Sequence, residues 1–97
     1  MYMVITRVKV QPDSIDHLAA LFDETNRDLV AEHEDWNGAW FTANRDTDEV
    51  TVIAHWSDPV SYERLRNSDA FGQVMARFAE RFAGPPEVSV NEVLVEM

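Results

Sequence analysis

Trp56 and Tyr62 are the residues of this chain best suited to hold or activate a small molecule. They flank "SDP", where a run of alternating residues ends and a helical pattern begins. An indole N–H donates one hydrogen bond and a phenol hydroxyl both donates and accepts, so the pair offers two donors to a ligand oxygen. Large aromatic side chains also fill cores. Two interpretations therefore stay open: the pair plugs a core, or it lines a pocket for an aromatic ligand.

Further residues have the position or the chemistry to line such a pocket. Thr6 is the one polar residue on the apolar face of the first predicted strand, and His33, near the end of the first predicted helix, is the candidate base. Buried threonines and lone histidines more often serve structure than chemistry, so both are hypotheses. The candidate walls of the pocket are Phe22, Phe71, Met75 and Phe78.

The spacing of polar residues excludes several kinds of site. No two of His17, His33 and His55 have metal-ligand spacing with a carboxylate on the same face. The 3 glycines are scattered and form no phosphate-binding loop for a flavin or nicotinamide nucleotide. We therefore predict no metal and no cofactor. An oxidation would then draw its electrons from the substrate, and an electron-rich phenol can reduce O2 once it is deprotonated.

Charge and composition limit the partners. The chain has 97 residues and a net charge of -10, and its 8 basic side chains are scattered among 18 carboxylates. Without a basic patch, nucleic acid and anionic membrane surfaces are excluded, and a neutral aromatic or apolar small molecule fits this field better. No apolar run approaches the ~20 residues needed to span a bilayer. With no secretory signal and no cysteine, we expect a cytoplasmic protein.

Periodicity predicts the element order β-α-β-β-α-β. Asp13 or Ser14 should cap the first helix, which runs from Ile15 to about Glu34, and Asn37-Gly38 should form a turn. The second helix has two parts, capped by Asp58 and Ser68, and "AGPP" ends it. The strands are predicted at 2–10, 39–44, 50–56 and 87–97, and residues 45–49 should turn between the two central strands.

These elements predict one domain over residues 1–97, an α+β ferredoxin-like antiparallel sheet with two helices on one face. The other face should carry Met3, Ile5, Trp40 and Ile53, with Thr51 and His55 among them. No predicted element remains to cover so apolar a surface, and a second copy of the same sheet is the economical cover. We therefore expect an obligate homodimer joined sheet to sheet.

Three stretches carry a resemblance to a known family: "WNGAWFTAN", "HWSDPVSYERLRNSDAF" and "AGPPEV". With this element order, the sequence resembles the antibiotic biosynthesis monooxygenase family of small dimeric α+β barrels. The resemblance covers nearly the whole chain and implies one such domain that forms a dimeric barrel. The family includes cofactor-free oxygenases of polyphenolic polyketides, haem-degrading enzymes, isomerases of signal molecules and members with no known reaction.

The resemblance also assigns residues. In the branch that resembles anthrone oxidases, the tryptophan and the tyrosine match Trp56 and Tyr62, whereas Val52 and Ala76 stand at the places of an asparagine and an arginine. The haem-degrading branch has asparagine, tryptophan and histidine where this chain has Thr6, Leu65 and Met75. The resemblance therefore implies a cofactor-independent monooxygenase of an electron-rich phenolic or polycyclic aromatic compound, with Trp56 and Tyr62 catalytic. The alternatives are a non-catalytic ligand-binding or assembly module and, third, a haem-binding member.

Overall fold

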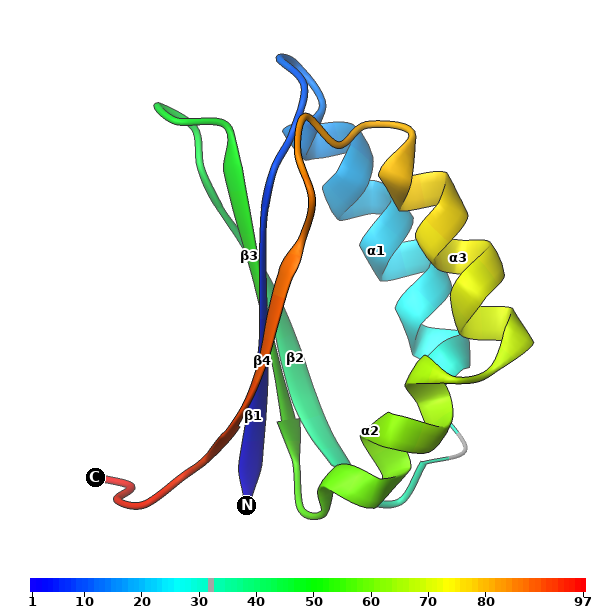
Figure 1. Ribbon diagram of the computed structural model, residues 1–97, viewed down its shortest axis with the longest axis vertical. Coiled ribbons are helices and arrows are strands. Elements are labelled where there is room, and N and C mark those ends of the chain that lie inside the picture. Colours follow the sequence, from blue (N-terminus) through cyan, green and yellow to red (C-terminus); the bar gives the residue numbers. More distant parts are fainter. Residues whose placement is uncertain (32) are drawn as a thin grey trace.

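A computed structural model describes residues 1–31 and 33–97. Its four strands form one antiparallel sheet in the order β2-β3-β1-β4, and all the helices lie on one face of that sheet (Figure 1). This is the predicted ferredoxin-like α+β fold, with the second helix divided in two. The elements are β1 (Tyr2–Lys9), α1 (Ile15–Val30), β2 (Trp36–Asn44), β3 (Glu49–Trp56), α2 (Pro59–Arg66), α3 (Asp69–Ala79) and β4 (Glu87–Glu92).

The core lies between the sheet and the helices and falls into two clusters of buried residues. One cluster joins the end of β1 and the start of β3 to α1 and α3, and the other joins the sheet to α2 and the end of α1. Alternation along the strands sends these side chains to the helical side because successive residues point to opposite faces. The first cluster is Val8, Val10, Ile15, Leu18, Leu21, Val50 and Phe78, and the second is Val4, Val30, Trp56, Tyr62 and Leu65.

α1 begins at Ile15 as predicted, but its capping and its end differ from the sequence-based prediction. Ser14 precedes the helix with φ -98° and ψ -15°, and its side chain caps no backbone N–H. A serine caps well from an extended backbone, and this helical conformation turns its hydroxyl away from the free amides. Asp13 adopts the left-handed region at φ 65° instead. The helix also ends at Val30, before the predicted end near Glu34.

The predicted turn at Asn37-Gly38 is wrong, because both residues lie inside β2. The register of β2 against β3 shifts between Trp36 and Gly38, which marks a β-bulge. Gly38 has φ 152°, a backbone conformation that residues with a side chain rarely adopt, so glycine suits the bulge. The strand therefore starts at Trp36, earlier than predicted, and Trp36 pairs with Trp56 at the end of β3.

The helical segments after β3 start where their capping residues predict. The Asp58 carboxylate accepts a hydrogen bond of 2.9 Å from the backbone N–H of Val60, and Pro59 opens α2. The Ser68 hydroxyl accepts one of 3.2 Å from the N–H of Phe71 at the start of α3. Phe82, which continues the apolar spacing of α3, lies beyond its end and bridges to Val10.

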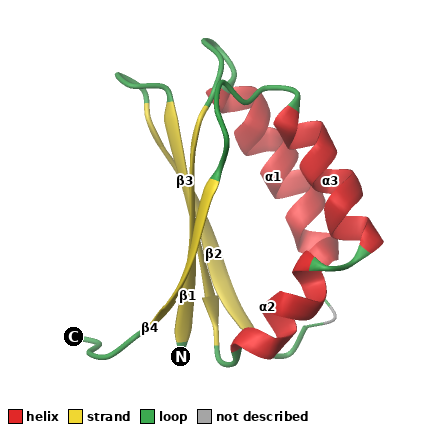
Figure 2. Ribbon diagram, in the orientation of Figure 1, coloured by secondary structure: helices red, strands yellow, loops and turns green. Residues whose placement is uncertain are grey.

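The face of the sheet opposite the helices carries no covering element in the described part of the chain (Figure 2). Trp40 is 52% exposed on that face, opposite Ile53 in the register. Met3 and Ile5 lie on the same face, paired with His55 and Ile53 across β1 and β3. No helix among the described residues is long and apolar enough to cross a membrane.

Candidate functional site

A cavity of about 510 Å³ lies between the sheet and the helices. This volume is within the range of about 300–1,000 Å³ that small-molecule sites occupy. Side chains from every strand and every helix line it, so the whole fold defines its shape. Most of the wall is aliphatic or aromatic, with contributions from Val4, Val8, Leu18, Phe22, Phe41, Val50, Val52, Ala54, Phe71, Val74, Met75 and Phe78.

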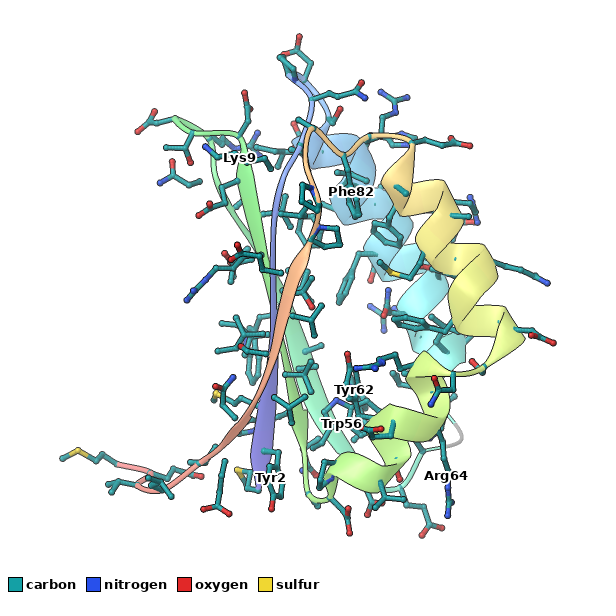
Figure 3. All side chains as sticks on the ribbon, viewed as in Figure 1. Tyr2, Lys9, Trp56, Tyr62, Arg64 and Phe82 are labelled. Atoms are coloured by element: carbon teal, nitrogen blue, oxygen red, sulfur yellow. The ribbon has the colours of Figure 1, made fainter. Side chains whose placement is uncertain are left out.

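Trp56 and Tyr62 lie together at one end of this cavity, between β3 and α2 (Figure 3). Their ring centroids are 6.0 Å apart and the ring planes are inclined by 58°. Both side chains are buried and both line the cavity. The two interpretations of the pair are therefore compatible, because the residues belong to a core cluster and also form a wall of the cavity.

The indole N–H of Trp56 has no hydrogen-bond partner among the described residues. Trp56 is only 1% exposed, and water does not reach this nitrogen. A buried donor without an acceptor destabilises the fold by about 1–3 kcal/mol, so such groups are rare outside functional sites. Because Trp56 also lines the cavity, this donor belongs to a residue of the cavity wall.

The hydroxyl of Tyr62 is the second polar group at this end. Burial raises the pKa of the Tyr62 phenol, and the charge of Arg66 on the next turn of α2 acts against that rise. The phenol is therefore protonated at neutral pH and is available as a hydrogen-bond donor.

The structure brings most of the predicted pocket residues to the cavity. Thr6, Phe22, Phe71, Met75 and Phe78 all line it. His33 does not line it: its ring lies edge-on to the indole of Trp56, with centroids 5.9 Å apart. The predicted base thus packs against a wall residue without lining the cavity itself.

Two places that the resemblance singled out are also located. Val52 lines the cavity from β3, so an apolar side chain occupies the position where the anthrone-oxidase branch has an asparagine. Ala76 and Arg77 are both exposed on α3 and neither lines the cavity. Met75, one position earlier, faces the ligand space instead.

Sequence reasoning missed the polar residues of the cavity wall. Asp23, Asn26 and Arg27 line it from α1, and Arg66 lines it from α2. The signal for Arg66 was present, because a residue four positions after Tyr62 lies on the same face of a helix. The charged and amide residues of α1 have the spacing of a solvated helix face, and that spacing alone does not indicate that they line a cavity.

No group of three or more potential metal-ligating side chains occurs among residues 1–31 and 33–97. A smaller hollow near the start of α1 is lined by Asp13, Ile15, Asp16, Arg45 and Asp48. Its arginine is already paired: the guanidinium of Arg45 lies 2.7 Å from Asp16 and holds the pKa of that carboxyl below its usual value. This hollow therefore surrounds a surface ion pair, with Asp13 and Asp48 as further acidic side chains beside it.

The fold and the site together define a ferredoxin-like α+β protein with an apolar, ligand-sized cavity between its two layers. Residues 1–77 match the sequence model of the family described as antibiotic biosynthesis monooxygenase, and the chain belongs to that family. No curated protein matches the chain in sequence.

Solved structures share the fold along nearly the whole chain. A protein of Mycobacterium tuberculosis, Rv0793, is 21% identical, with a TM-score of 0.79 over 98% of this chain and 96% of the other. A variant of SnoaB, a cofactor-independent oxygenase from Streptomyces nogalater, is 15% identical, with a TM-score of 0.82 over 99% and 95%. A conserved protein from Methanosarcina mazei is 16% identical, with a TM-score of 0.78 over 92% and 88%.

Proposed function

We propose that this protein is a cofactor-independent monooxygenase that oxidises an electron-rich phenolic or polycyclic aromatic compound inside the cavity between sheet and helices. The observation that carries the proposal is the combination of a cavity of about 510 Å³ with an unpartnered donor, the indole N–H of Trp56, in its wall. Membership of the family and the similarity to a cofactor-independent oxygenase support the same class of reaction.

The reaction that fits this site needs no redox cofactor, because the substrate itself supplies the electrons that reduce O2. An anthrone-type substrate loses a proton from its ring methylene, and the resulting anion is stabilised as a phenolate. The anion transfers electrons to O2, and a C–O bond forms to give a hydroperoxide. Loss of the second methylene hydrogen as a proton breaks the O–O bond. One oxygen atom stays as a ketone and the other leaves as water, so the methylene supplies all four electrons.

The residues of the site have separate parts in this scheme. The apolar walls keep water from the reactive anion, and a dry site strengthens every electrostatic interaction inside it. The Tyr62 hydroxyl and the Trp56 N–H are the donors to the oxygen that gains negative charge. Thr6 and Met75 line the same space and would contact the rings of the substrate. Of the groups in the wall, Asp23 is the carboxylate, and it is paired with Arg27 at 2.8 Å.

Oxygen uptake with an anthrone substrate tests this function. We expect wild type to consume O2 and to release the anthraquinone, and the double variant Trp56→Phe, Tyr62→Phe to be slower by roughly 100-fold, as when oxyanion donors are removed. The matched control is Trp40→Phe, Tyr2→Phe, which makes the same chemical changes outside the cavity wall. Equal rates for the two double variants would contradict the proposal.

A second candidate has an observation of its own. Val52 offers no polar group where the anthrone-oxidase branch has an asparagine, and His33 is shielded from the ligand space by Trp56. A protein that binds an aromatic ligand without oxidising it would keep the cavity and lack those polar groups. Ligand binding to wild type with no O2 uptake above the uncatalysed rate would favour this binding module.

We also propose that a second copy of the chain covers the open face of the sheet, as an isologous homodimer. Met3, Ile5, Trp40 and Ile53 gather there without a covering element, and Trp40 is 52% exposed. At about 25 cal/mol per Å² of apolar area, burying this face would strongly favour association. Sedimentation at micromolar concentration tests the dimer, and a folded wild-type monomer there would refute it.

A further inference from the structure

Three charged side chains line the otherwise apolar cavity: Asp23, Arg27 and Arg66. Two of them neutralise each other, because Arg27 donates hydrogen bonds of 2.8 Å and 3.1 Å to one oxygen of the Asp23 carboxylate. The ion pairs in the described part of the chain are this one and the pair between Arg45 and Asp16. Arg66 therefore brings to the cavity wall a positive charge that no carboxylate among the described residues pairs with.

Arg66 is placed beside the polar end of the cavity. It lies one turn after Tyr62 on α2, so the two side chains share a face of that helix. Its charge acts on the phenol of Tyr62, where it opposes the rise in pKa that burial causes. Arg64, two positions earlier, points away from the cavity into solvent and does not line it (Figure 3).

A ligand in this cavity meets a wall that is apolar over most of its area and cationic at one edge. An aromatic ring system fits the apolar part. The planar guanidinium of Arg66 holds several N–H donors in a fork that matches a carboxylate, and it also favours a single charged oxygen. Tyr62 beside it adds a neutral donor to the same oxygen, so the two groups form one anion-binding corner.

We propose that the cavity selects aromatic ligands that carry an anionic oxygen, a carboxylate or a phenolate, and that Arg66 is the residue that determines this preference. The proposal takes from the proposed function only the place where the ligand binds, and it holds whether or not the ligand is oxidised. The preference runs against the net charge of -10, which repels anions at long range. Arg66 is itself exposed, but it acts on a bound ligand at contact distance, whereas the spread-out net charge acts from farther away and is screened by salt beyond about 10 Å.

The same anion-binding corner would also promote the deprotonation that starts the oxygenase reaction. A phenol held next to a fixed positive charge ionises at a lower pH, since the cation stabilises the charged form. By lowering the pKa of the bound phenol, Arg66 would make its deprotonation less dependent on a general base. The resemblance places an arginine at position 76, where this chain has the exposed Ala76, and here an arginine reaches the cavity from α2 instead.

Calorimetric titration with naphthoate and its methyl ester tests the proposal without any oxidation step. The two probes share a ring system that the cavity can hold, and only naphthoate is charged at neutral pH. We expect wild type to bind naphthoate more tightly than the ester, by about three- to tenfold, as for one charge-assisted contact at a partly exposed edge. Arg66→Gln should lose this preference and leave the affinity for the ester unchanged.

Arg64→Gln is the matched control, because it removes the same charge from the same helix outside the cavity wall. We expect its naphthoate affinity to stay within about twofold of wild type, since an exposed charge at a distance is largely screened. Arg66→Lys should keep part of the preference. Equal losses in the two glutamine variants, a wild type that prefers the ester, or a wild type that binds neither probe would overturn the proposal. O2 uptake is measured separately, so the oxygenase function can fail while this preference stands.

Discussion

His55 and Trp56 are neighbours in the chain, yet they meet opposite surroundings on the two faces of the sheet. Trp56 faces the helices, where it is buried in a core cluster and lines the cavity. His55 faces the open side, where the exposed ring of Trp40 lies edge-on to it with centroids 5.9 Å apart. Each carries a buried side-chain nitrogen without a partner among the described residues, Nε2 in His55 and Nε1 in Trp56.

The two faces differ in the shape of the space beside these two nitrogens. On the covered face a partly open cavity lies between the helices and the sheet, and its volume suits a small molecule. On the open face the strands present a broad surface with Trp40 at its edge, which suits another protein surface. The two faces of one sheet therefore carry two different proposals, a ligand for the covered face and a second chain for the open face.

Ile53→Asp is the strongest test of the open face. In a sheet-to-sheet dimer this carboxylate would be buried without a cation, at a cost of about 3–5 kcal/mol per uncompensated charge. We expect the variant to unfold or aggregate, measured by sedimentation and circular dichroism. Gln73→Asp adds the same charge on the exposed side of α3 and should remain wild-type-like. If Ile53→Asp stays folded, soluble and as stable as wild type, the open face is not an interface.

Val52→Phe tests the covered face, because Val52 lines the cavity and a larger side chain there has space to enter. We expect naphthoate affinity to fall by about tenfold or more, while the midpoint of thermal unfolding is unchanged or raised. The control is Val10→Phe, at a buried position outside the cavity wall. Overpacking there should destabilise the fold by about 1–3 kcal/mol. Equal destabilisation by both variants would mean that the cavity has no usable space.

The smallest predicted effect concerns Tyr62 and alkaline pH. Burial raises the pKa of the Tyr62 phenol above its ordinary value of 10.0. At a pH between the ordinary pKa and the raised pKa, the phenol has lost its proton in the unfolded chain and keeps it in the folded chain. The free energy of unfolding therefore falls as pH rises through this range. Urea unfolding of wild type should show this loss above pH 10, and Tyr62→Phe should reduce it. Tyr2→Phe serves as the control, and if it has the same effect as Tyr62→Phe, burial of Tyr62 is not the cause.

Much of the fold could be predicted from residue patterns, because alternation and capping act locally. Asp58, Pro59 and Ser68 mark the helix starts correctly, and the hairpin between β2 and β3 turns where "RDTDE" predicts. The failures have tertiary causes. Asn37-Gly38 has the composition of a turn, but pairing with β3 makes it a bulge. Ser14 is buried by the packing around it, and its hydroxyl has no hydrogen-bond partner among the described residues.

The candidate site, like the fold, could be predicted from the sequence only in part. Its apolar walls were predicted because residues that face the helices also face the space between the layers. The size of that space was not predictable, since it depends on how far the helices stand from the sheet. For the same reason the sequence did not indicate that His33 packs against Trp56 without lining the cavity. Arg66 is a different case, because its spacing from Tyr62 does predict a shared helix face.

The pairing of β1 with β4 has a consequence for how the molecule folds. It joins Tyr2 to Glu92, so the loop that it closes contains almost the whole chain, whereas the β2-β3 hairpin closes a short one. Loop closure over long separations is entropically demanding and slow, so we expect β4 to add last to a sheet already formed by the other strands. Since Val88 of β4 lines the cavity, the binding chamber would be finished only in the final step of folding.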